Sequence, residues 1–337
     1  MRANQQFSNI SVIGDGGWGT TLAIHLAKKK YPVKLWGPFP DYVRKMKQDR
    51  YNPKFLPGIP IPAEVVLTED LKDAVDECDL VVFAVPSKYA YDVIRNIKNT
   101  QADFSKKIFL SVTKGIETKS FLRISQMVEK ELGNIAFAVL SGPNIAREVA
   151  LGVPSIAVVA SNQMAIAEEI QKIFNSDTFR IYTNSDVIGV ELAGSLKNII
   201  AIACGVCDGL GFGTNTKAAI LTRGLTEMAR LGEALGAQVQ TFFGLSGLGD
   251  LVTTSFNQQS RNRCLGEQLG KGKTLKEILS SMDMVAEGVD TVQAVYPLAE
   301  QHHVSMPITH EVYEILYKNK PPSQAVSNLM TREMKAE

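Results

Sequence analysis

A glycine-rich turn between an apolar strand and a helix is the sequence feature that most constrains the fold of this chain. The turn reads Gly14-Asp-Gly16-Gly-Trp-Gly19, directly after the apolar run ISVI and directly before the helical segment TTLAIHLAKKK. Gly14 permits a tight turn, Gly16 lets a pyrophosphate approach the backbone, and Gly19 permits close packing of helix on strand. Free N–H groups at the start of the helix attract phosphate. We therefore expect a dinucleotide-binding site in the first βα unit.

Short β-rich runs alternate with helical patterns through the first half of the chain. Several runs are almost continuously apolar, such as DLVVFAVP, which is typical of parallel strands buried on both faces. Strands are predicted over residues 7–13, 33–36, 65–68, 80–85, 108–112, 137–140 and 155–159. Helices are predicted between them over residues 20–30, 40–47, 89–97 and 121–132. This alternation predicts an α/β fold, a doubly wound Rossmann-type domain over residues 1–187.

The pattern changes near Asp186, after which β-branched runs almost disappear. Alanine, leucine, methionine and charged residues then recur at helical spacing. Helices are predicted over residues 187–206, 217–235, 260–270, 274–281, 289–302 and 307–317. The sequence therefore predicts an all-helical C-terminal domain over residues 188–337, packed closely on the first domain.

Composition and charge narrow the possible partners. The chain of 337 residues has 36 Lys and Arg against 35 Asp and Glu, so it has no overall electrostatic attraction to nucleic acid. Its unbroken apolar runs are shorter than the ~18 residues of a membrane span, and its N-terminus has no apolar signal region. Four cysteines are too few for a disulfide framework. We expect a cytoplasmic protein with no nucleic-acid partner and no membrane span.

Metal chemistry is not expected either. Cys204 and Cys207 form a single CxxC pair inside an apolar helix, without the second pair of a zinc site, and we interpret both as small core residues.

The end of the second predicted strand leaves the choice of cofactor open. NAD-specific Rossmann folds often place an acidic side chain there for the ribose hydroxyls. Here the sequence reads LWGPFPDYVRK, and Asp41 lies beyond that point at a helix start. Arg44 and Lys45 are either partners for a 2′-phosphate or a solvated helix face.

A long segment of the second half carries a specific resemblance. Residues 189–215 read GVELAGSLKNIIAIACGVCDGLGFGTN, which strongly resembles the signature of bacterial-type NAD(P)-dependent glycerol-3-phosphate dehydrogenase. Further matching blocks, in chain order, are FAVPS, TKGIE, SGPN, KAAILTRGLTEM, GLGDLVTT, SRNR and AEGVDT. The resemblance thus extends over nearly the whole chain.

The resemblance implies an activity and a set of site residues. The reaction would be the reversible reduction of dihydroxyacetone phosphate to sn-glycerol 3-phosphate with NAD or NADP as cofactor, supplying glycerol phosphate for phospholipid synthesis in a homodimeric enzyme. By motif match, Lys197 is the proton donor and acceptor. The implied substrate contacts are Lys114, Gly142, Asn144, Lys197, Asp250, Ser260, Arg261 and Asn262. The cofactor contacts are Gly14, Gly16, Gly17, Trp18, Gly19, Lys114, Ala146, Arg261, Val285 and Glu287.

Four positions depart from the family pattern. Gly17 replaces the usual serine and removes a possible hydroxyl contact to the pyrophosphate. Asn144 replaces threonine or serine, and Ser195 replaces alanine or threonine. Pro38 stands where the family often has arginine or histidine, and a proline cannot pair with a 2′-phosphate.

The residue types themselves allow the same chemistry and also simpler explanations. A lysine can protonate a substrate oxygen if burial or a nearby cation lowers its pKa, but Lys197 could also be a snorkelling lysine at a domain boundary. Asp250 is either a helix cap or a partner that orients Lys197 or a substrate hydroxyl. Ser260 is a plausible N-cap, whereas Arg261 offers paired donors to a phosphate. Lys114 follows a strand, where α/β sheets expose their ligand crevice.

Two other functions use a similar architecture. A β-hydroxy-acid dehydrogenase shares the two-domain plan, but it favours a carboxylate-binding set and different spacing around its lysine. A non-catalytic nicotinamide sensor would not need Lys197 or Arg261.

Overall fold

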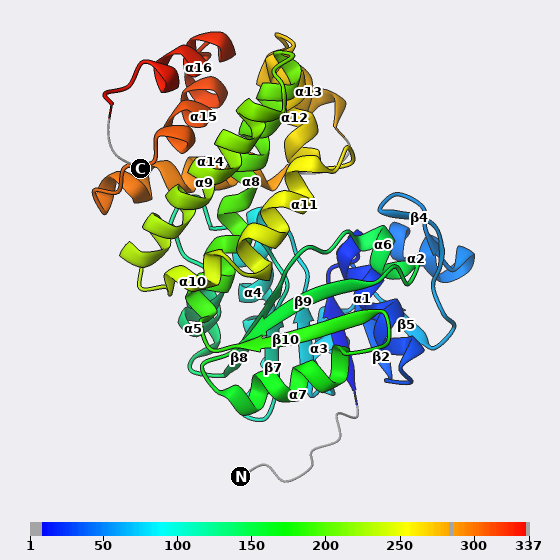
Figure 1. The fold of residues 1–337 in the computed structure, drawn as a ribbon. Coiled ribbons are helices and arrows are strands. Elements are labelled where there is room, and N and C mark those ends of the chain that lie inside the picture. Colours follow the sequence, from blue (N-terminus) through cyan, green and yellow to red (C-terminus); the bar gives the residue numbers. More distant parts are fainter. Residues whose placement is uncertain (1–8, 283–285, 335–337) are drawn as a thin grey trace. The chain divides into compact units, whose positions relative to one another are not determined.

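The chain divides into a sheet unit and a helical unit, seen in a computed structural model that describes residues 9–282 and 286–334 (Figure 1). The sheet unit comprises Met1–Thr113 and Ile124–Val187. The helical unit comprises Ile188–Glu337 together with the segment Lys114–Arg123. A single boundary at residue 187 therefore does not describe the division completely, because this segment of the first half packs with the second.

In the part of the chain that the structure describes, the sheet unit is built on eight strands in the order β10-β9-β8-β7-β6-β1-β2-β5. Their bounds are β1 Ile10–Ile13, β2 Val33–Trp36, β5 Val65–Thr68, β6 Leu80–Phe83, β7 Ile108–Ser111, β8 Ala136–Ser141, β9 Ser155–Ala160 and β10 Phe179–Asn184. Neighbouring strands are parallel except β8 and β9, which run antiparallel. From β5 to β8 the order is that of a dinucleotide-binding fold, with β1 at the switch point. The doubly wound Rossmann-type prediction is confirmed.

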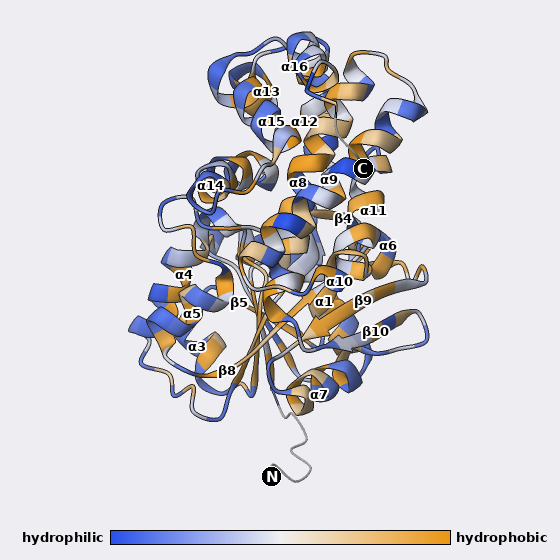
Figure 2. Cartoon of the chain, turned by 60° about the vertical axis from the view of Figure 1, so that its left-hand side comes forward, coloured by the Kyte–Doolittle hydropathy of each residue, from blue (hydrophilic) through white to orange (hydrophobic). Residues whose placement is uncertain are grey.

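Within residues 9–187, seven helices accompany these strands along the chain. They are α1 Gly17–Lys28, α2 Pro40–Asp49, α3 Leu71–Asp76, α4 Ser87–Asn99, α5 Ile124–Leu132, α6 Ala146–Ala150 and α7 Met164–Phe174. Every residue of β1, β6 and β7 is buried, which explains why their sequences are apolar apart from Ser11 in β1 and Ser111 in β7. In Figure 2 the hydrophobic colour follows the strands, while hydrophilic residues gather on α4 and α5.

Helices α3, α6 and α7 and two features of the strands lie outside the sequence prediction. The edge strand β10 has the sequence FRIYTN, in which buried and exposed residues alternate, so it lacks a continuous apolar run. A small antiparallel hairpin, β3 Tyr51–Asn52 with β4 Leu56–Pro60, is separate from the main sheet and contains Gly58 and Pro60. Neither has the pattern by which the buried parallel strands are recognised.

The helical unit contains no strand among its described residues, as predicted. Its α-helices are α8 Val187–Gly209, α9 Thr214–Ala234, α10 Val239–Phe242, α11 Asp250–Phe256, α12 Arg261–Gly270, α13 Leu275–Ser281, α14 Glu287–Gln301, α15 Pro307–Lys318 and α16 Pro322–Met330. A π-helical turn, η1 Leu245–Gly249, leads directly into α11. Leu192, Ile199 and Ile202 of α8 lie in the hydrophobic core of this unit.

Helix α8 is long and apolar enough to cross a membrane by length and composition alone. The sequence prediction considered unbroken apolar runs, and Glu191 and Lys197 interrupt this one. In the structure 94% of its most apolar window is buried within the protein, so α8 is a core helix. Cys204 and Cys207 are buried on it, as predicted for small core residues.

Candidate functional site

The glycine loop of the sheet unit has the geometry of a phosphate cradle. Gly14 has a φ of +117°, and a Cβ there would lie 2.7 Å from the carbonyl oxygen of Ala84. A Cβ on Gly19 would lie 1.9 Å from the carbonyl oxygen of Gly14, so only glycine permits this approach of helix to loop. A Cβ on Gly16 would meet no atom within 4 Å, so the backbone is open there. These three environments match the three roles expected of the motif and fit a dinucleotide pyrophosphate.

The first turn of α1 adds a favourable electrostatic environment. The helix begins after Gly16 with no side-chain cap and no acidic residue in its first turn. Its N–H groups and its dipole therefore favour a phosphate. The Trp18 ring packs edge-on against Phe179, with ring centroids 6.3 Å apart.

The hairpin gives a physical reason for the glycine at position 17. A Cβ on Gly17 would lie 2.6 Å from the backbone carbonyl oxygen of Phe55, which belongs to the turn between β3 and β4. Real side chains do not tolerate this distance to a backbone atom. The serine usual in the family would require the hairpin to move in this chain.

Cationic side chains near the end of β2 are engaged with neighbours on their own helix. Arg44 forms an ion pair with Asp41, and Lys45 Nζ lies 3.6 Å from a carboxylate oxygen of Asp49. All four side chains are at least 41% exposed, which agrees with a solvated helix face. Pro38 is exposed directly beyond the strand.

The turn after β8 positions two further predicted residues of the sheet unit. Gly142 has a φ of +143°, and a Cβ there would lie 3.0 Å from Cα of Ala157. The side-chain amide of Asn144 donates to the carbonyl oxygen of Ile156 at 2.8 Å. Its Oδ1 is buried without a hydrogen-bond partner among the described residues. Ala146 is the first residue of α6.

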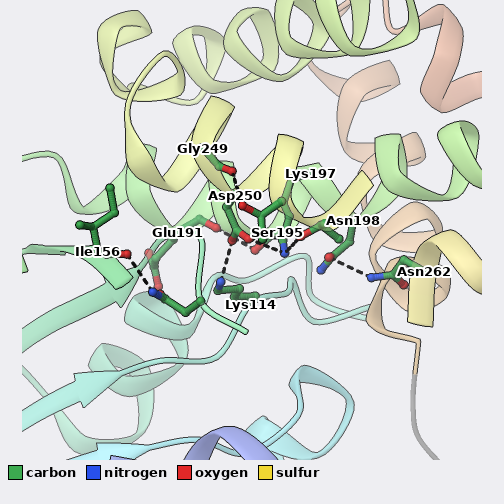
Figure 3. A network of polar contacts seen from close by, with 12 residues as sticks. Lys114, Ile156, Glu191, Ser195, Lys197, Asn198, Gly249, Asp250 and Asn262 are labelled. Carbon is green, nitrogen blue, oxygen red and sulfur yellow. Dashed lines mark hydrogen bonds and ion pairs between the residues drawn. The ribbon is translucent and has the colours of Figure 1, made fainter. Parts of the chain in front are cut away.

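In the helical unit, three charged side chains converge on one point (Figure 3). Asp250 Oδ1 lies 2.9 Å from Nζ of Lys197, and Oδ2 lies 2.6 Å from Nζ of Lys114. Asp250 is 2% exposed and Lys197 is 6% exposed. Lys197 also donates to the hydroxyl oxygen of Thr254 at 2.6 Å. The sequence prediction placed Lys114, Lys197 and Asp250 together in one site, and in the structure both lysines contact Asp250 directly.

Burial and charge act in opposite directions on these groups. Burial lowers the pKa of Lys197 to about 8, although the carboxylate of Asp250 opposes this shift and the ammonium of Lys114 adds to it. Burial alone would raise the pKa of Asp250. The neighbouring ammonium groups of Lys114 and Lys197 outweigh burial and hold this pKa below its usual value. The cluster is therefore a buried carboxylate with a lysine that is poised to lose its proton near neutral pH.

Local structure explains how Asp250 enters this cluster. It is the first residue of α11, and the preceding η1 turn brings the backbone of Gly247 against Phe242, where a Cβ would lie 2.0 Å from a carbonyl oxygen. Asp250 and Thr254 are four residues apart and share one face of α11. Because Asp250 pairs with both lysines and α11 has Gly249 as its N-cap, the helix-cap interpretation of Asp250 is wrong.

Lys114 reaches the cluster because its segment is anchored in the helical unit at both ends. Ile116 is 1% exposed and belongs to the helical core. Arg123 forms an ion pair of 2.5 Å with Glu191 of α8. Ser195, one turn after Glu191 on the same helix, donates its hydroxyl to the carbonyl oxygen of Glu191 at 2.7 Å.

The remaining predicted residues of the helical unit lie around the start of α12. Ser260 is the N-cap, and its hydroxyl accepts a hydrogen bond from the backbone N–H of Arg263, so the cap prediction is confirmed. Arg261 is exposed at the first position of the helix. Glu287 is the first residue of α14. Val285, a predicted cofactor contact, lies outside the described residues.

Asn262 is fully engaged within the unit. Its amide nitrogen donates to Oδ1 of Asn198 at 2.9 Å, and its Oδ1 accepts from the backbone N–H of Gly288 at 2.9 Å. It thereby links α12 to α8 and to the start of α14. Its partner Asn198 follows Lys197 in the chain, and its partner Gly288 follows Glu287.

Comparisons with known proteins show the family of this chain. A family model for the N-terminus of NAD-dependent glycerol-3-phosphate dehydrogenase matches residues 9–167, and the model for its C-terminus matches residues 186–327. A glycerol-3-phosphate dehydrogenase [NAD(P)+] from Citrifermentans bemidjiense is 48% identical over 333 residues, covering 97% of this chain and 98% of the relative. The chain belongs to the glycerol-3-phosphate dehydrogenase family.

Further relatives support the assignment along the whole chain. A glycerol-3-phosphate dehydrogenase [NAD(P)+] from Chlorobium phaeobacteroides is 46% identical over 331 residues, covering 97% of this chain and 98% of the relative. The crystal structure of the Coxiella burnetii glycerol-3-phosphate dehydrogenase superposes with a TM-score of 0.93 at 40% identity, covering 96% of this chain and 99% of the other. The family and fold predicted from the sequence motifs are confirmed.

Two polar residues that contact the predicted set were absent from it. Thr254 contacts Nζ of Lys197, and Asn198 holds Asn262. The spacing of Asp250 and Thr254 on one helical face would have indicated the first, since residues four apart are neighbours on a helix. Nothing in the sequence indicates that Asn198 and Asn262 meet.

Proposed function

We propose that this chain catalyses the reversible reduction of dihydroxyacetone phosphate to sn-glycerol 3-phosphate with NADH or NADPH. The observation that carries the proposal is the buried contact of Lys197 with Asp250 in a chain that belongs to the glycerol-3-phosphate dehydrogenase family. Reduction of a ketone needs a hydride for the carbon and a proton for the oxygen. When bound, the dihydronicotinamide supplies the hydride.

Lys197 supplies the proton in this proposal. Its ammonium donates from Nζ to the substrate oxygen as the C–O double bond becomes a single bond, and Lys197 is left as the neutral amine. In the reverse direction the neutral amine accepts the proton of the alcohol. A pKa of about 8 allows both protonation states near neutral pH, which an ordinary lysine does not.

Asp250 and Thr254 orient this lysine. An ammonium has three N–H donors, and the contacts seen among the described residues direct two of them to Asp250 and Thr254. The third N–H can therefore point to a substrate oxygen. Asp250 is a positioning residue that also keeps Lys197 charged before the proton is transferred.

The phosphate end of the substrate needs fixed donors. We assign Arg261 to it, because this guanidinium stands exposed at the first position of α12, where paired N–H donors and the helix N-terminus both attract a dianion. Ser260 and Asn262 shape the same end of α12. The full set of proposed substrate contacts is Lys114, Gly142, Asn144, Lys197, Asp250, Ser260, Arg261 and Asn262.

In the sheet unit, the glycine loop holds the cofactor pyrophosphate. The support is the open backbone at Gly16 and the uncapped start of α1. The proposed cofactor contacts are Gly14, Gly16, Gly17, Trp18, Gly19, Lys114, Ala146, Arg261 and Glu287, with Val285 added from the family resemblance alone.

We also propose that the enzyme works as a homodimer in the cytoplasm and supplies glycerol phosphate for phospholipid synthesis. The support is the family resemblance. It is accompanied by free thiols at Cys78, Cys204, Cys207 and Cys264, as expected in a reducing compartment.

One assay separates the proposed function from the alternatives. The enzyme is mixed with NADH and dihydroxyacetone phosphate, and the nicotinamide absorbance is followed. Parallel reactions contain a β-keto acid in place of dihydroxyacetone phosphate. Consumption of NADH with dihydroxyacetone phosphate alone supports the proposal. Turnover of β-keto acids alone indicates a β-hydroxy-acid dehydrogenase, and cofactor binding without turnover indicates a sensor.

A further inference from the structure

The end of β2 lacks the acidic residue that many Rossmann folds use for the adenosine ribose. In these folds a carboxylate about 20 residues after the glycine motif accepts hydrogen bonds from the ribose hydroxyls. Here Gly37, Pro38 and Phe39 follow the strand, and none of them carries a carboxylate. Asp41 follows on α2, with its side chain exposed and paired with Arg44.

The glycine loop places a carboxylate at this point instead. Strands β1 and β2 are parallel neighbours, and the N–H of Gly14 donates to the carbonyl oxygen of Trp36 at 3.0 Å. Asp15 and Gly37, the next residues after Gly14 and Trp36, are therefore also adjacent. A Cβ built on Gly37 would lie 2.3 Å from Oδ2 of Asp15 and 2.6 Å from its Cγ. The Asp15 carboxylate thus occupies the space that a side chain at position 37 would need.

This carboxylate is buried and incompletely satisfied. Asp15 is only 6% exposed, and its Oδ2 has no hydrogen-bond partner among the described residues. Its backbone is held firmly, since its carbonyl oxygen accepts from Asn52 Nδ2 at 2.7 Å and from Thr20 Oγ1 at 3.2 Å. Burial raises the pKa of Asp15 to about 6, so the group is still largely ionised at neutral pH. A buried acceptor without a donor calls for an explanation such as a role towards a ligand.

We propose that Asp15 replaces the missing acidic residue of β2 and selects NADH over NADPH. Its free Oδ2 would accept a hydrogen bond from a ribose hydroxyl of NADH. The 2′-phosphate of NADPH brings its own negative charge to the same place, and as a dianion it offers no hydrogen-bond donor. The two negative charges repel each other strongly in a buried environment. The inference rests on the proposed function, because it assumes that NADH and NADPH are the cofactors of this chain.

The test measures equilibrium binding of NADH and NADPH by fluorescence, without substrate. We compare the parent enzyme with Asp15→Asn, which keeps the shape and one acceptor but removes the charge. Asp41→Asn is the matched control, because Asp41 is a second carboxylate at the same end of β2 but is exposed and paired. We expect the parent to bind NADH at least about tenfold more tightly than NADPH, and Asp15→Asn to bind NADPH about tenfold more tightly than the parent does.

The outcomes are distinct. Equal affinities in the parent, or an unchanged NADPH-to-NADH ratio in Asp15→Asn, would overturn the proposal, as would an equal shift in Asp41→Asn. If Asp15→Asn does not fold, Asp15→Ser removes the same charge with less volume and is subject to the same criteria. Turnover of dihydroxyacetone phosphate is measured separately. A parent that shows the expected affinity ratio but no turnover contradicts the proposed function and leaves the assignment of Asp15 intact.

Discussion

The carboxylate of Asp250 lies 2.9 Å from Nζ of Lys197, and both side chains are almost completely buried. A buried charge pair is costly to form and more costly to break, because removal of one partner leaves the other uncompensated. Here the second carboxylate oxygen contacts Lys114, so Asp250 keeps a cationic partner when Lys197 loses its proton. The arrangement lets one lysine change its charge without leaving the carboxylate unpaired.

Lys197→Met tests the proton donor directly. Methionine keeps the apolar stem and removes every group that can donate to the substrate oxygen, so kcat should fall at least about 10²-fold. NADH affinity, measured by fluorescence, should be retained because the glycine loop belongs to the sheet unit. Lys320→Met is the control, since Lys320 is also a little-exposed lysine in an ion pair, with Glu311. A near-normal kcat in Lys197→Met would show that Lys197 is not the proton donor and would favour the interpretation as a snorkelling lysine.

The pKa of Lys197 predicts opposite pH profiles for the two directions. Reduction requires the ammonium form, so its kcat should fall as the pH rises through about 8. Oxidation of glycerol 3-phosphate requires the neutral amine, so its kcat should rise through the same pH. Initial rates at saturating substrate, measured between about pH 6 and 10 in both directions, check this. Parallel profiles would contradict the assignment.

Lys114→Met should move this inflection. The ammonium of Lys114 contributes to the lowered pKa of Lys197, so its removal should raise that pKa and shift both profiles to higher pH. The same pH series on the variant measures the shift. If kcat falls but the inflection stays in place, Lys114 acts only through substrate binding.

Arg261→Ala should weaken recognition of the substrate phosphate. A charge-assisted contact is worth about 1.5–3 kcal/mol, so KM for dihydroxyacetone phosphate should rise about 10- to 100-fold. Inorganic phosphate should inhibit the parent competitively and the variant much less. Lys271→Ala removes an exposed cation just after the other end of α12 and should leave KM unchanged. A lower Tm with an unchanged KM would show that Arg261 serves the helix alone.

Glu227 predicts a pH dependence of stability away from the site. It accepts from the backbone N–H groups of Ile308 and Thr309 at the start of α15, and burial raises its pKa to about 7. The folded state therefore binds this proton more tightly than the unfolded state, whose pKa is near 4.5. The free energy of unfolding should decrease by a few kcal/mol, of order ~3, as the pH rises from about 4.5 to 7. Urea unfolding of the parent and Glu227→Gln checks this, and the variant should lack this part of the slope.

The sequence predicted the elements that carry a strong local pattern. The parallel strands were recognisable because burial on both faces favours almost continuously apolar runs, as in β6 and β7. Strand β10 was missed because an edge strand buries only alternate residues. The hairpin β3–β4 was missed because its strands are short and contain glycine and proline.

For the site, motif matching indicated Lys114, Lys197 and Asp250, but the sequence left a contact of Asp250 with Lys197 as one of the alternatives and predicted none between Asp250 and Lys114. Asp250 lies 136 positions from Lys114 and 53 positions from Lys197, so both contacts depend on the long-range path of the backbone, which no local pattern encodes. The same holds for Asp15. Its carboxylate reaches the end of β2 only because β2 lies beside β1 and is followed by Gly37. Contacts between residues far apart in the chain are thus the part of the site that could not be predicted from the sequence.

The segment Lys114–Arg123 has a consequence for engineering. The helical unit is discontinuous in sequence, since it takes a segment from the middle of the other unit. A chimaera of two relatives joined at residue 187 would combine the 114–123 segment of one parent with the helices of the other. Three contacts would then join different parents: Ile116 with the helical core, Lys114 with Asp250, and Arg123 with Glu191. Recombination that respects the architecture needs three crossovers, with the segment inherited alongside the C-terminal half.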